Sequence, residues 1–242
     1  MKFVTTSVIA FGISCAGVGL LSVFATASAN AESVAETVWI PMKEVDAAGE
    51  RTIRLEATLY KPAGEGPFPL VMFNHGSSGG PIPPEYTEKA KALGAYLVEK
   101  GVSLIVPMRR GRGKSEGENQ EEPSPCTLEV AKQGVKYASA AVDATYEYLR
   151  LQPWVSMNKV VLAGHSRGGI LAVEYAADHP GSTIGVINFS GGWKNDNCGP
   201  TDLNLELFAE AAGKSKVPNL FLYGRGDAFY SDDSVNNYAE TF

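Results

Sequence analysis

One stretch of ten residues constrains the fold of this chain more than any other. Residues 160–169 read VVLAGHSRGG, an apolar run followed by G-x-S-x-G, and an Ala-rich helical pattern comes next. This order predicts a buried strand, a sharp turn with Ser166 at its tip, and a helix leading away. Gly164 and Gly168 would let the strand and helix approach without Cβ clashes. Ser166 is therefore a candidate nucleophile; a serine that only caps the helix is the alternative.

The rest of the chain alternates short apolar runs with helical patterns. Residues 36–45 and 51–60 alternate apolar and polar side chains around a turn, which predicts an antiparallel hairpin. Continuous apolar runs predict buried strands at 70–73, 102–106, 159–163, 184–189 and 219–223. Helical spacing predicts helices at 86–100, 128–151, 167–178, 203–212 and from 235 onward. We expect an α/β fold, a mostly parallel sheet with that hairpin at its N-terminal side and helices on both faces.

The first 31 residues differ in character from the rest. Lys2 precedes the apolar stretches 8–13 and 18–24, and small residues follow at 27–31. This pattern predicts a signal peptide over 1–31, cleaved after Ala31, and therefore a periplasmic or secreted protein. Cleavage would leave no stable membrane insertion and a single domain over 32–242. An uncleaved membrane anchor is the alternative.

Composition limits the partners and the redox setting. The 242 residues carry a net charge of −6 and no basic run, which argues against a nucleic-acid-binding surface. Without the leader, Cys126 and Cys198 remain, and an even pair predicts a disulfide in an exported protein. Two inert thiols are the alternative. The pattern does not indicate an oligomeric state.

Several residues near predicted strand ends suit acyl transfer, which needs a nucleophile, a base, an orienting acid and oxyanion donors. Ser166 is the predicted nucleophile, and the backbone N–H of Arg167 is one predicted donor. Ser77 follows the strand at 70–73, so its N–H is the second predicted donor. Asp227 lies on a tight loop after the strand at 219–223 and is the predicted acid.

Other acids are weaker candidates for that role. Asp196 and Asp202 follow the preceding strand and are the poorer alternative. Asp232 and Asp233 lie in a polar run that is expected to cap a helix at Ser231 or Asp232.

Four motifs resemble those of the α/β-hydrolases in order and spacing. They are H-G-S at 75–77, R-G-x-G-x-S-x-G at 110–117, G-H-S-R-G-G at 164–169 and Y-G-x-x-D at 223–227. Within that fold the chain most resembles the dienelactone hydrolase-like esterases and the prolyl oligopeptidase-type catalytic domains. The resemblance implies a serine hydrolase that cleaves small-molecule esters or similar acyl compounds through an acyl-enzyme, without a cofactor or metal. A peptidase of the prolyl oligopeptidase type and a non-catalytic binding protein are the alternatives.

The base is missing from this pattern. The chain's three histidines, His75, His165 and His179, all precede Asp227, whereas the order in this fold is serine, acid, histidine. His165 is expected to point away from the serine, His75 to shape the oxyanion loop, and His179 to end a helix. We therefore expect a C-terminally truncated sequence, inactive by itself, whose last strand, helix and catalytic histidine lie beyond residue 242. A non-catalytic relative is the alternative.

The arginine-rich run at 109–115 has two interpretations. It could bind an anionic substrate, but it lacks the strand-to-helix placement of a phosphate loop. A structural loop with one arginine pinned under the sheet edge is favoured, and the acidic stretch at 116–122 is expected to be solvated. No group of residues has the spacing of metal ligands.

Overall fold

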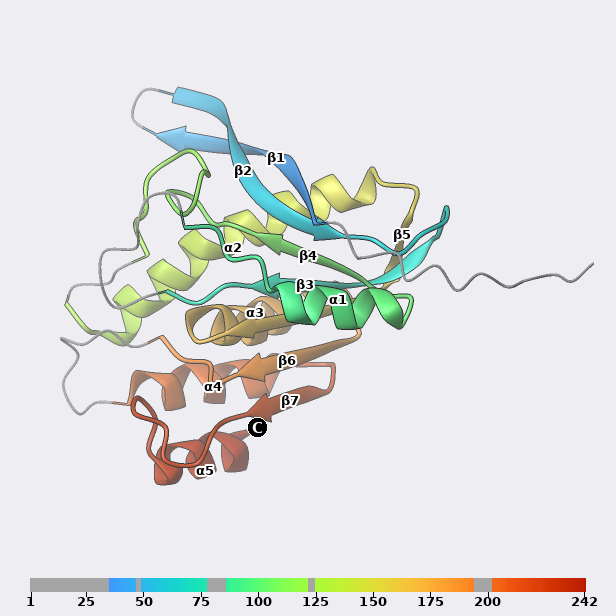
Figure 1. Ribbon diagram of the computed structural model, residues 1–242. Coiled ribbons are helices and arrows are strands. Elements are labelled where there is room, and N and C mark those ends of the chain that lie inside the picture. The colour runs from blue at the N-terminus through green and yellow to red at the C-terminus, as the bar shows by residue number, and fades with distance from the viewer. Residues whose placement is uncertain (1–34, 47–48, 78–85, 122–124, 194–201) are drawn as a thin grey trace, which may run out of the picture. The chain divides into compact units, whose positions relative to one another are not determined.

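The computed structural model describes residues 35–46, 49–77, 86–121, 125–193 and 202–242 (Figure 1). In these ranges seven strands form one sheet in the order β1-β2-β4-β3-β5-β6-β7. The strands are β1 (Glu36–Asp46), β2 (Gly49–Tyr60), β3 (Phe68–Asn74), β4 (Ser103–Pro107), β5 (Val155–His165), β6 (Gly185–Phe189) and β7 (Asn219–Leu222). The helices are α1 (Lys91–Glu99), α2 (Leu128–Arg150), α3 (Arg167–Asp178), α4 (Leu203–Lys214) and α5 (Asp232–Thr241).

The sheet is parallel except at its N-terminal side. β1 pairs with β2 along its whole length in antiparallel register, and β2 pairs antiparallel with β4. β4, β3, β5, β6 and β7 are all parallel neighbours. The expected hairpin and mostly parallel sheet are therefore confirmed. Because the strands from β3 onward run the same way, their carboxyl ends share one edge of the sheet.

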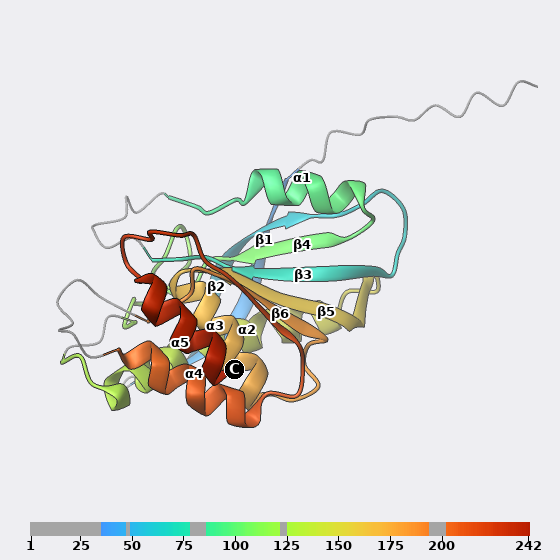
Figure 2. The same cartoon turned by 90° about the horizontal axis from the view of Figure 1, so that it is seen from below.

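Helices cover both faces of the sheet, as the alternating pattern predicts. Figure 2 shows α1 on one face and α2, α3 and α4 on the other. α1 packs against the smaller core cluster, which includes Tyr60, Leu104 and Val106. Gly94 of α1 lies so close to the Tyr60 ring that a Cβ there would come within 2.6 Å of ring atoms. The larger cluster lies under α2, α3 and α4.

One helix is shorter than its sequence pattern predicts. The expected helix at 86–100 begins only at Lys91, because polar side chains hold the preceding residues in another conformation. Glu88 accepts the Ala90 N–H at 2.8 Å and the Tyr86 hydroxyl at 2.7 Å, and Ala90 has a φ of 45°. Local side-chain bonds thus replace the first helical turn.

The start of α5 follows its predicted cap. The Ser231 side chain accepts the Ser234 N–H at 3.1 Å, and Asp232 and Asp233 occupy the first turn. Both the cap and the two carboxylates suit a helix N-terminus.

Glu174 is a buried carboxyl group of α3 that makes stability depend on pH. Its side chain is buried between helices, and in the described ranges its Oε1 has no hydrogen-bond partner. Burial, reinforced by the negative charge of Asp178 and offset in part by Lys214, raises the pKa of Glu174 to about 8. The folded protein therefore holds this proton more tightly than the unfolded chain. The protonated Glu174 carboxyl contributes its full stabilisation at pH values below the pKa that it has in the unfolded chain. That contribution is lost as the pH rises toward its folded-state pKa of about 8.

We expect Glu174→Gln to remove this loss of stability at alkaline pH. The variant should match the parent near pH 4 and exceed it at pH 8 by on the order of 2 kcal/mol, after discounting for relaxation of the site. That difference corresponds to a Tm increase of about 4–8 °C, measurable by thermal melts across the pH range. Glu147→Gln, at an exposed partner of Arg150, is the matched control. Parallel pH profiles for Glu174→Gln and the parent would contradict this assignment.

Candidate active site

Ser166 lies at a sharp turn between β5 and α3. Its backbone has φ 52° and ψ −124°, a region that residues other than glycine adopt only under strain. Its side chain makes no capping hydrogen bond to α3. Backbone bonds hold the turn, since the Ser166 N–H donates to Phe189 O at 2.9 Å and the Ser166 carbonyl accepts the Gly192 N–H at 3.1 Å. The turn thus presents the hydroxyl at the carboxyl edge of the sheet.

The two glycines of the motif are needed for close packing. A Cβ on Gly164 would lie 2.1 Å from the carbonyl oxygen of Gly168, within the same turn. A Cβ on Gly168 would lie 2.1 Å from the carbonyl oxygen of Asn74, at the end of β3. The strand and the helix therefore approach as the sequence predicts, the neighbouring strand β3 packs against the same turn, and any larger residue would force these elements apart.

The loop after β3 reaches the same point from the neighbouring strand. A Cβ on Gly76 would lie 3.2 Å from the Cβ of Ser166, so the backbone at 76 runs directly beside the serine. Ser77 follows it, and its Oγ lies 3.4 Å from the Nη2 atoms of both Arg109 and Arg112. The structure thus brings Ser77 close to the turn at Ser166 and Arg167. The backbone N–H groups of Ser77 and Arg167 are the predicted oxyanion donors.

His75 is a structural part of this loop. Its Nε2 accepts the Arg109 N–H at 3.1 Å, so its Nδ1 carries the proton and donates to Gly76 O at 2.6 Å. Burial, and then the positive charge of Arg109, lowers the pKa of His75 to about 3. The ring is neutral with both nitrogens engaged, as expected for a residue that shapes the loop.

The other two histidines also have positions unlike that of a catalytic base. The His179 ring stacks on Tyr175 with centroids 4.0 Å apart, and its backbone caps the end of α3. His165 is exposed, and its Nδ1 faces the backbone at Gly76. The structure records no bond from either ring to Ser166 within the residues it describes.

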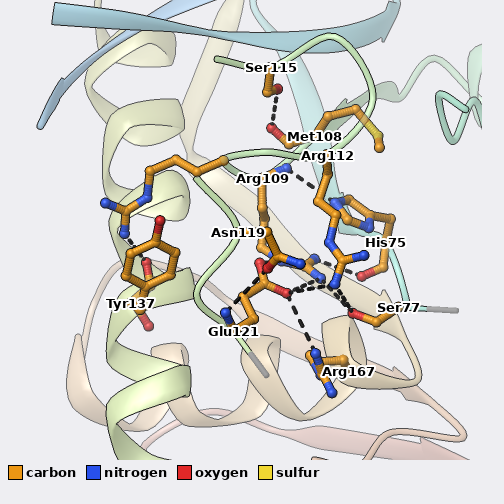
Figure 3. A network of polar contacts seen from close by, with 12 residues as sticks. His75, Ser77, Met108, Arg109, Arg112, Ser115, Asn119, Glu121, Tyr137 and Arg167 are labelled. Carbon is orange, nitrogen blue, oxygen red and sulfur yellow. Dashed lines mark hydrogen bonds and ion pairs between the residues drawn. The ribbon is translucent and has the colours of Figure 1, made fainter. Parts of the chain in front are cut away.

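The arginine-rich run forms a buried network rather than an open basic surface. Arg109, Arg112 and Arg167 surround Glu121, and all four side chains are at least nine-tenths buried (Figure 3). Arg109 makes a bidentate pair with Glu121, its Nε donating to Oε1 at 2.6 Å and its Nη2 to Oε2 at 3.1 Å. The pinned arginine is therefore confirmed. The expectation of a solvated stretch at 116–122 is wrong at Glu121, which these arginines hold inside the protein.

Asp227 lies on the loop after β7, where its carboxylate orders the chain that follows. Its Oδ1 accepts the N–H of Phe229 at 2.8 Å and that of Tyr230 at 3.2 Å. The Tyr230 hydroxyl reaches the same turn, since a Cβ on Gly192, whose N–H donates to the Ser166 carbonyl, would lie 2.4 Å from the hydroxyl oxygen. Burial, and then the charge of Asp227, raises the pKa of Tyr230 to about 12, so the hydroxyl stays protonated. This loop therefore lies beside the serine.

The remaining predicted positions are the weaker acid candidates, the two cysteines and the signal peptide. Asp202, the weaker acid candidate, accepts the Tyr238 hydroxyl with both carboxylate oxygens at 2.8 and 2.9 Å. Asp196 and Cys198 lie outside the described residues, as does the predicted signal peptide. Cys126 is disulfide-bonded.

Glu121 and Tyr230 are the site residues that the sequence analysis did not single out. Tyr230 stands three residues after the predicted acid, and no motif marks it. Glu121 belongs to an acidic, proline-containing loop whose composition is typical of solvent exposure. The nearby arginine run was the one available signal, because buried arginines require a carboxylate partner.

Comparison with known proteins decides the family. The sequence profile of the Dienelactone hydrolase family matches residues 55–242. The chain belongs to the dienelactone hydrolase family. It is also 29% identical over 196 residues to a protein of Nocardia uniformis subsp. tsuyamanensis named "Putative esterase NocK". That match covers 80% of this chain, which spans 50% of the length of this curated relative.

Solved structures place this family member in the α/β-hydrolase fold. It is similar to Est1E from Butyrivibrio proteoclasticus, solved with ferulic acid, at 17% identity and a TM-score of 0.60 over 85% of both chains. It is also similar to the acylaminoacyl peptidase of Pyrococcus horikoshii, at 16% identity and a TM-score of 0.60. That likeness covers 86% of this chain and 34% of the peptidase. At such identities the structures establish the fold alone.

Membrane-crossing helices and clusters of metal ligands are both absent from the described ranges. None of the helices there combines the length and hydropathy that a bilayer crossing requires. No three His, Cys, Asp or Glu side chains in the same ranges gather as metal ligands would.

Proposed function

We propose that this member of the dienelactone hydrolase family is a serine hydrolase that cleaves small carboxylic esters through an acyl-enzyme on Ser166. The observation that carries the proposal is the strained backbone of Ser166 at the tip of the β5–α3 turn. A serine that only capped α3 would use its side chain for that purpose, and this one does not. The esterase relative supports the choice of ester substrates.

The proposed reaction follows from the groups around the serine. A base takes the Ser166 hydroxyl proton as the oxygen attacks the ester carbonyl carbon, and the Arg167 and Ser77 N–H groups bind the resulting oxyanion. The tetrahedral intermediate collapses, the C–O bond to the alcohol breaks, and the alcohol leaves with the proton held by the base. Water then attacks the acyl-enzyme in the same way and releases the carboxylic acid.

We propose that the base is a histidine oriented by Asp227, and that it is none of His75, His165 and His179. The positions of His75, His165 and His179 support this, since none of the three rings is recorded in contact with Ser166. Only binding and oxyanion contributions would remain in a chain without that histidine, about 10³–10⁴-fold over water.

We also propose export, with residues 1–31 as a cleaved signal peptide and Cys198 as the disulfide partner of Cys126. The disulfide at Cys126 supports this, because disulfides persist in oxidising compartments. Tryptic mapping of the non-reduced secreted protein would identify both the new N-terminus and the linked cysteines.

A fluorophosphonate probe and a substrate panel test the function. On the full-length protein we expect the probe to label the peptide that contains Ser166. We also expect p-nitrophenyl esters to be hydrolysed with a higher kcat/KM than aminoacyl p-nitroanilides. Absence of labelling would overturn both enzyme functions and favour a binding protein on this fold. Faster cleavage of the anilides would replace the esterase with a peptidase.

A further inference from the structure

Glu121 is a buried carboxylate that joins two segments of the candidate site. None of its side chain is exposed, and it lies between the loop after β3 and the start of α3 (Figure 3). Besides its bidentate pair with Arg109, its Oε2 lies 3.8 Å from Arg112 Nη2 and 3.9 Å from Arg167 Nη1. The Glu121 side chain therefore contacts Arg109 and Arg112, which contact Ser77 in the loop after β3, and also Arg167, which directly follows Ser166.

On the first side, Arg109 holds the loop after β3. Its backbone N–H donates to His75 Nε2 at 3.1 Å, and its Nη1 donates to the His75 carbonyl oxygen at 2.7 Å. Its Nη2 lies 3.4 Å from Ser77 Oγ. The loop position thus depends on the orientation of the Arg109 guanidinium, and the bidentate pair with Glu121 sets that orientation.

On the second side, Arg167 is the residue directly after the predicted nucleophile. Its guanidinium lies over the Trp193 ring, 5.0 Å from the centroid, and faces Glu121. Arg167 is also the first residue of α3. Movement of this side chain would therefore be transmitted to the N–H group beside Ser166.

The charge state of Glu121 suits a fixed electrostatic anchor. Burial alone would raise the pKa of this carboxyl, but the charge and hydrogen bonds of Arg109 outweigh it and lower the pKa to about 2. An always-ionised carboxylate with both oxygens occupied is a poor proton acceptor. Glu121 is therefore suited to orient its arginine partners and not to transfer protons.

We propose that Glu121 is a positioning residue for the oxyanion hole, setting the separation of the Ser77 and Arg167 backbone N–H groups. The inference rests on the proposed serine hydrolase function. Oxyanion donors act at about 2.7–3.1 Å from the charged oxygen, so a small displacement weakens transition-state binding. Substrate binding before the reaction depends less on that distance. Loss of Glu121 should therefore lower kcat more than it raises KM.

Glu121→Gln and Glu121→Asp in the full-length protein test this role. Glutamine keeps the shape and removes the charge, whereas aspartate keeps the charge and shortens the reach. We expect kcat per fluorophosphonate-titrated site to fall about 10- to 100-fold for Gln and less for Asp, with KM within about threefold. Glu116→Gln, on the same loop but in an exposed pair with Arg54, is the matched control and should leave both constants unchanged.

Inhibition by phenylboronic acid provides a second measurement. If Glu121 only stabilised the fold, its substitution would not weaken this inhibitor more than a neutral one. The Ser166 oxygen bonds to trigonal boron, its proton passes to the base, and the resulting anionic tetrahedral adduct occupies the oxyanion hole. We expect its Ki to rise about tenfold in Glu121→Gln, while the Ki of a neutral, substrate-like amide stays near that of the parent.

Four outcomes would overturn the inference. Unchanged kcat per titrated site in Glu121→Gln would do so alone, as would equal weakening of the boronate and the amide. If the glutamine variant fails to fold, unchanged kcat and boronate Ki in Glu121→Asp would have the same force. A parent protein that is neither labelled nor active would overturn the proposed function, and this inference with it.

Discussion

Replacing Ser166 with alanine is expected to lower ester hydrolysis by about 10⁴- to 10⁶-fold and to abolish fluorophosphonate labelling. The substitution removes the only atom that forms the acyl-enzyme and leaves the surrounding backbone unchanged. Because the side chain makes no capping bond to α3, the free energy of unfolding should change by no more than about 1 kcal/mol. Initial rates on a short-chain p-nitrophenyl ester and a thermal melt measure both effects.

Ser166→Gly is the companion variant that separates catalysis from backbone strain. Glycine adopts the φ of 52° and ψ of −124° without the steric cost that serine and alanine bear. It should be as inactive as the alanine variant and about 1 kcal/mol more stable. Activity retained in either variant would refute Ser166 as the nucleophile. Equal stability of the two would refute a strained elbow.

Asp227→Asn is expected to lower kcat about 10²- to 10⁴-fold at neutral pH, with KM near that of the parent. Asp227 already accepts the Phe229 and Tyr230 N–H groups through Oδ1, so its orientation is set by the loop. Its second oxygen can then accept the ring N–H of the proposed histidine. Asparagine preserves the loop bonds but turns an NH₂ toward that ring, which favours the wrong tautomer. Steady-state kinetics on the full-length protein measure the change.

Two matched substitutions give this prediction its controls. Asp233→Asn lies in the first turn of α5, exposed, and should leave kcat unchanged. Asp202→Asn alters the carboxylate that accepts the Tyr238 hydroxyl and should affect stability more than kcat. A large fall in kcat for Asp202→Asn, with none for Asp227→Asn, would transfer the role of the acid to Asp202.

Most of the fold was predictable because its strands and helices have clear periodicity. α3 was predicted with its observed bounds, and the hairpin and the parallel strands follow the apolar runs. The prediction was wrong where a specific side-chain bond overrides periodicity. At Tyr86 to Ala90, the Glu88 carboxylate holds the backbone out of the helix, and no local pattern shows that bond.

The candidate site was predictable only in part. Motifs mark Ser166, Arg167 and Asp227, because the turn, the proposed donor and the proposed acid stand at spacings typical of this fold. Glu121 lies in a loop of polar composition, and its burial depends on three arginines that approach it from β4's loop and from α3. Arg109 and Arg112 belong to the same loop as Glu121 and only Arg167 is distant in the chain, but the composition of a loop does not show which of its charged side chains turn inward.

The sequence by itself determined the family, the strand–serine–helix turn and the order in which the candidate catalytic residues occur. Its glycines at 164 and 168 are required because a Cβ at either position would lie 2.1 Å from a backbone carbonyl oxygen. Only the tertiary structure decided that the arginine run is internal and that Glu121 joins the loop after β3 to the start of α3. The physical reason is that a charged side chain leaves water only where oppositely charged partners surround it. Those partners come together only when the chain folds.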